Sequence, residues 1–235
     1  MGLLNDILSI LKKHEISLKE KYSEVGDIYT FIFETKEEIN WKAGQHGIFT
    51  INHTKVNKPT RAFSIASIPS EGHIRISMKI SEKPSEFKQA LLNLQPGMKI
   101  SMRGPIGSFY PKNKRPLLFI AGGIGITPYR ALIKDLLLNS GEISNDIRLL
   151  YIDSGEEFIY TEELDKVSKI FSIQINYLIK RENLNEEIEK FITKYNNEAE
   201  YFIVGSKSMI NAIEALLKSK GIKQKNIKKD TFVGY

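Results

Sequence analysis

From residue 117 onward, the sequence alternates short apolar runs with segments of helical periodicity. The first run, LLFIAG at 117–122, carries no charged residue, which is typical of a parallel strand covered on both faces. The expected strands are 117–122, 147–153, 173–179 and 200–205, and the expected helices are 127–141, 161–170, 185–195 and 208–221. Strand–helix repeats of this length predict an α/β domain built on a doubly wound parallel sheet.

The preceding part of the chain follows a different pattern, in which short strand-like segments are separated by turn signals. The expected strands are 27–35, 46–53, 61–67, 73–80 and 98–104, with one expected helix at 84–94. Short strands at this spacing predict a small antiparallel β-barrel that one helix caps. The polar segment PKNKRP at 111–116 separates the halves, so domains are expected at 14–112 and 113–235.

Residues 1–13 carry apolar side chains at helical spacing. They predict a short amphipathic helix docked on the body of the protein, with a membrane-surface anchor as the alternative. No apolar run reaches the length of about 18 residues that a transmembrane helix needs. The N-terminus also lacks the pattern of a signal peptide, so a cytoplasmic location is expected.

Composition excludes several kinds of chemistry. The chain has no cysteine, which excludes disulfides, thiolate-bound iron–sulfur clusters and cysteine-based zinc sites. Its four histidines lack the spacing of common zinc motifs, so no metal ligands are expected. The net charge of +6 comes from basic residues interspersed with acidic ones. This pattern favours an acidic protein partner over nucleic acid.

Two glycine-containing turns follow expected parallel strands, AGGIGITP at 121–128 and VGSKSM at 204–209. Glycines let a backbone approach a phosphate closely, and a helix N-terminus offers free N–H groups. Thr127 is expected to cap the first of these helices, with Pro128 at its first position. Neither turn matches GxGxxG or a P-loop, and each has an ordinary structural turn as its alternative. Together they favour an extended ligand such as a dinucleotide.

The barrel half contributes three further segments, RAFSIAS at 61–67, KPSEF at 83–87 and GPIGSF at 104–109. They combine a cation, an aromatic ring, hydroxyls and a helix start. Each has a structural alternative: a surface arginine, a core phenylalanine, a helix cap or a tight turn.

In this order and spacing, RAFSIAS, GPIGSF, AGGIGITP and VGSKSM resemble the motifs of the ferredoxin–NADP⁺ reductase superfamily. The short, stand-alone bacterial FAD-dependent reductases are the most similar members. The resemblance implies an enzyme that moves hydride from NADPH or NADH to bound FAD, with both rings stacked between the domains. Electrons then pass to a one-electron acceptor, such as an acidic ferredoxin or flavodoxin, or to an oxygenase component.

The resemblance also assigns the FAD site. By similarity, Arg61 pairs with a flavin phosphate, Phe63 lies against the isoalloxazine ring, and Ser64 bonds the reactive flavin nitrogen. These residue types suit the roles, because guanidinium forks bind phosphate and aromatic faces stack on flat rings. The further candidates for FAD binding are Ser67, Lys79, Pro84 and Ser85.

For the nicotinamide dinucleotide, the implied residues are Gly123, Gly125, Thr127, Pro128, Gly205 and Met209. The second motif departs from the family pattern, because Val204 and Ser206 stand where cysteine and proline are usual. Lys180 and Arg181 favour NADPH by pairing with a 2′-phosphate. Asp153 favours NADH by accepting from a free 2′-hydroxyl. Of the two, NADPH is preferred.

The tail DTFVGY resembles the family's closing segment, in which an aromatic ring covers the flavin. Tyr235 is the first candidate and Phe232 the second, with a frayed chain end as the alternative. Tyr235 and Ser64 are therefore the expected catalytic residues. Two other functions stay open: a reductase of free flavin or ferric chelates, and a flavin- or nucleotide-binding regulatory module without turnover.

Overall fold

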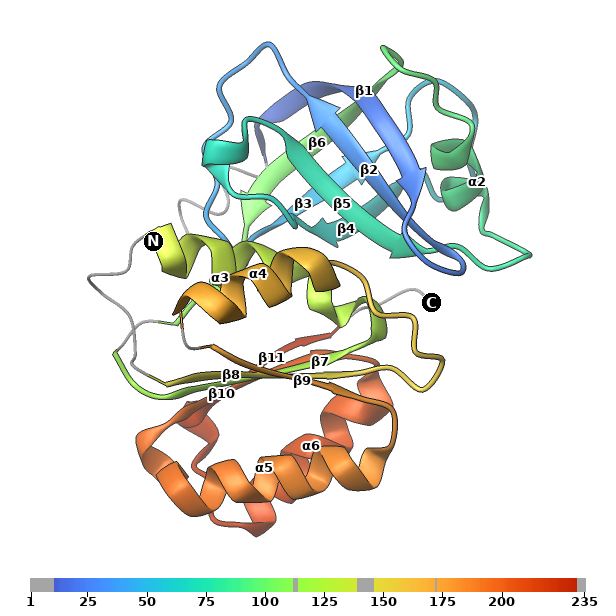
Figure 1. Cartoon of the computed structure of the whole chain (residues 1–235). Helices are drawn as coiled ribbons and strands as arrows, with labels where there is room; N and C mark the ends of the chain where they lie inside the picture. Colours follow the sequence, from blue (N-terminus) through green and yellow to red (C-terminus); the bar gives the residue numbers. More distant parts are fainter. Residues whose placement is uncertain (1–10, 112–113, 139–145, 172, 232–235) are drawn as a thin grey trace. The chain divides into compact units, whose positions relative to one another are not determined.

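The computed structural model of the chain describes residues 11–111, 114–138, 146–171 and 173–231 (Figure 1). The chain forms two compact units, Met1–Ser108 and Phe109–Tyr235. The helix expected at 1–13 falls almost entirely outside the described residues. Within them, Leu11 is 73% exposed and the first strand begins at Lys13.

The first unit is a curled antiparallel sheet with one α-helix among its described residues. Its elements are β1 (Lys13–Ser23), β2 (Ile28–Glu34), β3 (His46–Thr50), β4 (Thr60–Ser64), β5 (Ile74–Lys79), α2 (Glu86–Leu92) and β6 (Lys99–Ile106). The strand order is β4-β3-β6-β1-β2-β5, and every neighbouring pair is antiparallel. This arrangement confirms the antiparallel architecture expected for the first half.

Strands β1, β3 and β4 differ from the sequence-based expectation, and β3 ends at Thr50 rather than at residue 53. The expected strands did not include β1, although His14, Ile16 and Leu18 alternate inward and are buried. β4 ends at Ser64 rather than at residue 67. It ends there because the backbone N–H of Ala66 already donates to the carbonyl of Arg75, on the strand at the other edge of the sheet.

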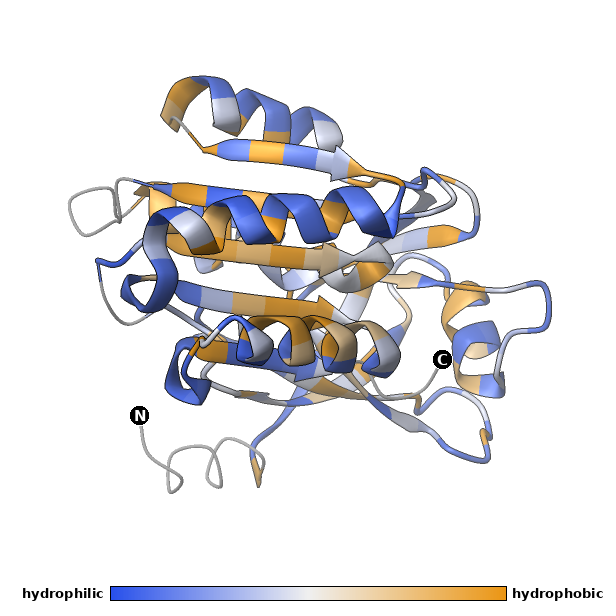
Figure 2. Cartoon of the chain, turned by 90° about the horizontal axis from the view of Figure 1, so that it is seen from below, coloured by the Kyte–Doolittle hydropathy of each residue, from blue (hydrophilic) through white to orange (hydrophobic). Residues whose placement is uncertain are grey.

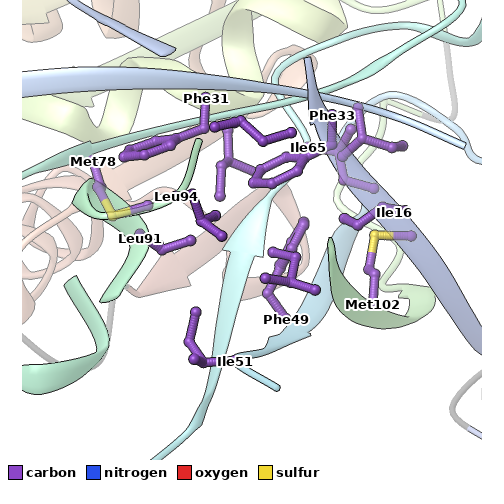
Figure 3. Packing of buried hydrophobic residues seen from close by; sticks show 14 of the residues in the cluster. Ile16, Phe31, Phe33, Phe49, Ile51, Ile65, Met78, Leu91, Leu94 and Met102 are labelled. Atoms are coloured by element: carbon purple, nitrogen blue, oxygen red, sulfur yellow. The ribbon is translucent and has the colours of Figure 1, made fainter. Parts of the chain in front are cut away.

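Aromatic and aliphatic side chains fill the inside of this curled sheet (Figure 3). Phe31 and Phe33 point to the same face of β2, and the Phe33 ring lies 6.2 Å from that of Phe49 on β3. Leu91 adds its side chain from α2 and is fully buried. Lys21 on β1 holds the end of this helix, because its ammonium donates to the carbonyls of Leu92 and, at 2.6 Å, Leu94.

The second unit is a parallel sheet with helices on both faces, as expected. Its strands are β7 (Leu117–Gly122), β8 (Ile147–Ile152), β9 (Gln174–Leu178), β10 (Glu200–Gly205) and β11 (Ile227–Thr231), and its α-helices are α3 (Thr127–Leu138), α4 (Thr161–Phe171), α5 (Arg181–Tyr195) and α6 (Lys207–Ser219). The strand order is β11-β10-β7-β8-β9. Helices α3 and α4 cover one face and α5 and α6 the other (Figure 1). The closing segment of the chain supplies β11, parallel to β10.

Burial in the second unit follows the hydropathy of its elements. The central strands β7 and β10 are buried almost throughout, whereas the helices combine hydrophobic and hydrophilic residues (Figure 2). Phe109, the first residue of this unit, packs edge-on against Phe202 with ring centroids 5.1 Å apart. Among the described residues, no helix has both the length and the apolar character needed to cross a membrane.

Candidate functional site

Strand β4 is an edge strand, and its aromatic residue bridges the sheet and α2. β4 pairs with β3 alone among the described strands, so its other edge carries no strand partner. The Phe63 ring makes an edge contact with Phe49 at 5.8 Å and a stacked contact with Phe87 of α2 at 5.9 Å. Phe63 is therefore attached to the core and remains partly exposed. This position agrees both with a core phenylalanine and with a residue whose ring lies against the isoalloxazine.

Arg61 lies on the same edge strand without a carboxylate partner among the described residues. Its Nη1 donates to the carbonyls of Lys58 at 3.1 Å and Thr60 at 2.7 Å. The guanidinium also lies over the Phe87 ring, 5.7 Å from its centroid. These contacts orient the positive charge without neutralising it, which is the condition a phosphate-binding arginine needs.

Lys88 of α2, which is not among the candidates predicted from the sequence, brings a second cation close to Arg61. Its Nζ donates to the Lys79 carbonyl at 2.7 Å. Burial lowers the pKa of Lys88; the Asp27 carboxylate opposes the shift, and the Arg61 guanidinium adds to it. The positive charges of Arg61 and Lys88 are thus near enough to repel each other, and the Arg61 guanidinium lies over the Phe87 ring. One sequence feature could have identified Lys88 as a candidate: it is the third residue of a helix that Ser85 caps.

The two serines of RAFSIAS have different surroundings. Ser64 ends β4 and is nearly buried, and its hydroxyl binds no other described residue. Ser67 is fully buried; its hydroxyl donates to the His73 carbonyl at 2.7 Å and accepts from the Arg75 N–H at 3.0 Å. The Ser64 hydroxyl is therefore not engaged by another described residue, whereas the Ser67 hydroxyl stabilises the turn after β4.

The remaining barrel candidates surround the start of α2. Ser85 caps this helix, its hydroxyl accepting from the Lys88 N–H at 3.4 Å, and Pro84 precedes it partly exposed. The helix begins at Glu86, two residues later than expected, because Ser85 is its cap. Lys79 ends β5 with an exposed side chain 3.2 Å from the Asp27 carboxylate. All of these residues belong to the first unit.

In the second unit, the strand order reverses between β7 and β10, and both strands end in glycine there. Ligands bind sheets of this kind outside the carboxyl ends of the strands at such a reversal. A side-chain Cβ on Gly125 would lie 2.5 Å from the Val204 carbonyl oxygen. Gly125 is therefore required for close backbone packing, whether or not a phosphate also binds there.

The turn after β7 differs from the expected helix cap. Residues Gly123–Ile126 form a 3-10 helix that leads directly into α3. Thr127 is consequently a helical residue, and its hydroxyl donates to the Ile124 carbonyl at 3.1 Å rather than capping the helix. Thr127 and Pro128 are both buried in this structure. The expectation of Thr127 as the helix cap is therefore wrong. The helical segment begins earlier, with the 3-10 helix at Gly123, whose positive φ of +52° favours glycine.

The residues expected to select the nucleotide lie at neighbouring carboxyl ends. Asp153 follows β8, and its Oδ1 accepts from the N–H groups of Gly155 at 2.8 Å and Glu157 at 3.3 Å. Lys180 and Arg181 follow β9 and are exposed at the start of α5, which begins four residues before the expected 185. Asp153 and the Lys180–Arg181 pair thus all lie at the carboxyl edge of the sheet. The Asp153 carboxylate also stabilises the turn that follows β8.

The candidates at the other side of the reversal come from β10 and α6. Gly205 ends β10, and Ser206 caps α6 by accepting from the Met209 N–H at 3.3 Å. Strand β11 runs parallel to β10, with Thr231 opposite Gly205, so the chain leaves the sheet at this same edge. Phe232 and Tyr235, the expected ring-covering residues, lie outside the described residues.

Comparison with known proteins supports the fold and the barrel half. Residues 13–110 match the family model described as oxidoreductase FAD-binding domain. Residues 13–110 are therefore similar to an oxidoreductase FAD-binding domain. The chain is also similar to the ferredoxin–NADP⁺ reductase of Plasmodium falciparum, with a TM-score of 0.82 and 20% identity over 94% of this chain and 96% of that one. This likeness confirms the two-domain ferredoxin–NADP⁺ reductase fold.

Two curated relatives extend the comparison. A component of the Na⁺-translocating NADH-quinone reductase of Chlamydia caviae is 34% identical over 164 residues, which cover 63% of this chain and 38% of that protein. The toluate 1,2-dioxygenase electron transfer component of Pseudomonas putida is 24% identical over 185 residues, 74% of this chain and 54% of that protein. The chain thus spans between about a third and just over half of these relatives.

The FAD-binding domain carries residues that suit this cofactor. Arg61 offers an unneutralised guanidinium, Lys88 offers a second cation, Ser64 offers a hydroxyl, and Phe63 offers part of a ring face. A phosphate would relieve the repulsion between the two cations, and a flat ring system would suit the aromatic edge. The described residues therefore fit a phosphate-bearing aromatic cofactor such as FAD.

Proposed function

We propose that this chain is a flavin-dependent oxidoreductase that takes hydride from NADPH or NADH and delivers electrons to a one-electron acceptor. Bound FAD supplies the chemistry, since it accepts a hydride and can release electrons singly. The observation that carries the proposal is the Arg61 guanidinium, which no described carboxylate neutralises and which lies over the Phe87 ring within the residues that match an FAD-binding domain.

Binding and orientation are the tasks of the barrel residues. Arg61 and Lys88 hold the phosphates, and Phe63 supports the flavin ring. The Ser64 hydroxyl can donate to or accept from a flavin nitrogen as its protonation changes. In the second unit, the glycine-marked edge of the sheet receives the nicotinamide dinucleotide, with Gly123 and Gly205 at the reversal. No acid–base residue is required in this scheme.

The acceptor is an acidic electron-transfer protein or an oxygenase component. The net charge of +6 favours an acidic partner. One relative is the electron transfer component of toluate 1,2-dioxygenase, an oxygenase system. If the acceptor docks through charge, the bimolecular rate with an acidic ferredoxin falls as ionic strength rises. A rate that does not respond to salt contradicts this part of the proposal.

The assignment of Arg61 is tested by measuring FAD affinity. Arg61→Ala removes one charge-assisted contact, worth roughly 1.5–3 kcal/mol, and should raise the FAD dissociation constant about ten- to hundred-fold. Arg103→Ala is the matched control, since Arg103 is an exposed cation on β6 of the same unit. Unchanged affinity in Arg61→Ala, or an equal loss in Arg103→Ala, contradicts the assignment.

Steady-state kinetics separate this function from reduction of free flavin. An enzyme with resident FAD keeps its yellow cofactor through gel filtration and reduces an artificial one-electron acceptor without added flavin. A free-flavin reductase loses the colour and shows saturable dependence on added flavin. A regulatory module without turnover retains flavin yet leaves it oxidised when NADPH or NADH is added.

A further inference from the structure

The thioether of Met209 fills the space between the two strand ends at the reversal of the parallel sheet. A Cβ on Gly122, at the end of β7, would lie 2.2 Å from Met209 Sδ. A Cβ on Gly205, at the end of β10, would lie 2.9 Å from the same sulfur and 3.6 Å from the Cα of Gly122. The sulfur therefore packs directly on two glycine backbones, at the edge where the dinucleotide is proposed to bind.

Met209 is also partly exposed, whereas two of the other three methionines that the structure describes are buried. Met78 is 3% exposed and Met102 is fully buried. Met98 is partly exposed like Met209, but it lies in the first unit, where its sulfur accepts from the Gln95 N–H at 3.2 Å. The described residues thus include two buried methionines for comparison and one partly exposed methionine in the other unit.

We propose that Met209 is an oxidation site at which formation of methionine sulfoxide weakens dinucleotide binding. The oxidant is hydrogen peroxide. It transfers one oxygen atom to the sulfur: the O–O bond breaks, an S–O bond forms, the sulfur loses two electrons and the peroxide is reduced to water. The effect on binding rests on the proposed function, because it assumes that the dinucleotide occupies this edge.

The packing around the sulfur explains why oxidation matters here. The contacts with Gly122 and Gly205 leave no room for a side-chain atom between sulfur and backbone. The sulfoxide oxygen must therefore point away from the strands, toward the ligand edge, or force the strand ends apart. It also turns a flexible apolar side chain into a polar one. Either outcome disturbs the surface that the glycines form.

The test treats the purified protein with limited hydrogen peroxide and maps each methionine by peptide mass spectrometry. Binding of the oxidised nucleotides NADP⁺ and NAD⁺, which cannot reduce the flavin, is then measured by calorimetry. We expect Met209 to oxidise faster than Met78 and Met102. The dissociation constant should rise about ten-fold, the usual effect of one unpaired polar group at a binding surface. Methionine sulfoxide reductase should restore the original affinity.

Met209→Leu provides the matched variant, because leucine keeps the apolar volume and cannot form a sulfoxide. Affinity is compared before and after peroxide within each protein, so any change in the starting affinity of Met209→Leu does not affect the result. The variant should keep its affinity after treatment, although Met98 is still oxidised. An equal loss in Met209→Leu overturns the proposal, as does sulfoxide at Met209 with unchanged affinity in the unmodified sequence. If the untreated protein binds neither nucleotide, the proposed function itself fails.

Discussion

Gly125 allows the packing of the sheet to be tested independently of any ligand. In Gly125→Ala, the new methyl group would lie 2.5 Å from the Val204 carbonyl oxygen and 2.9 Å from its carbonyl carbon. These are backbone atoms of the central strand β10, which is buried along its whole length. They cannot move aside as a flexible side chain would, so the turn or the strand must shift.

The expected cost follows from this overlap. Overpacking a close-packed region typically costs about 1–3 kcal/mol. Replacing glycine by alanine where the backbone conformation allows it instead stabilises a protein by about 0.4–1 kcal/mol, and Gly125 does not have the positive φ that favours glycine. A measured loss of stability therefore reports the collision with Val204 and not the backbone conformation of residue 125.

The two units can be followed by different signals. The chain has one tryptophan, Trp41, which is buried in the first unit. The long helices that the structure describes belong to the second unit, so far-ultraviolet circular dichroism reports mainly on that unit. In denaturant titrations, Gly125→Ala should lower the midpoint of the circular dichroism transition by an amount equivalent to about 1–3 kcal/mol, with a smaller effect on Trp41 fluorescence.

Gly155→Ala is the matched control in the same unit. Its Cβ would meet only side-chain atoms, the nearest being Asp153 Oδ1 at 3.3 Å, and Gly155 is exposed. This variant should change stability by less than about 1 kcal/mol. Equal stability of Gly125→Ala and the unmodified protein would refute the argument that close backbone approach requires glycine at 125.

Three further predictions concern stability. Lys21→Met removes the donor to the carbonyls at the end of α2 and should lower the free energy of unfolding by about 1 kcal/mol, measured by Trp41 fluorescence. An unchanged denaturation midpoint would contradict this role of Lys21. Asn226→Ala removes hydrogen bonds to Arg115 and to the loop before β10 and should lower the free energy of unfolding by about 1–3 kcal/mol, measured by circular dichroism. Unchanged stability of this variant would contradict the expectation. Hydrogen bonds from lysines on α6 and β11 lower the pKa of Glu214 from 4.5 to about 2. The stabilisation is therefore complete above about pH 4.5 and is lost as the pH falls toward 2. Glu214→Gln should weaken this pH dependence, and identical acid titrations of the two proteins would contradict the ion pairs.

The sequence predicted the sheet types well, because hydrophobic periodicity depends on which faces an element buries. The uncharged run that forms β7 is one example, since this strand has neighbours on both sides and helices on both faces. The pattern was less informative for β1, where exposed charged residues alternate with only a few buried apolar ones. Strand β11 was also hard to recognise, because IKKDT is an edge strand with a mostly polar sequence.

Local hydrogen bonding explains most of the differences at the candidate site. Thr127 resembled a helix cap in sequence, but the 3-10 turn before it already satisfies its hydroxyl. Ser67 resembled a second ligand-binding hydroxyl, yet it bonds two backbone groups of a neighbouring segment. Lys88 was missed because its proximity to Arg61 depends on α2 packing beside β4, a tertiary contact that no local pattern encodes.

The central claim is hydride transfer from a nicotinamide dinucleotide to bound FAD. It is tested most directly by anaerobic titration of the FAD-loaded protein with NADPH and NADH in turn, following the flavin absorbance. The proposed function predicts rapid bleaching of the flavin at about one equivalent of nucleotide, with NADPH the more effective donor, and recovery of the colour when a one-electron acceptor is added. Flavin that remains oxidised with both nucleotides would contradict the proposed function.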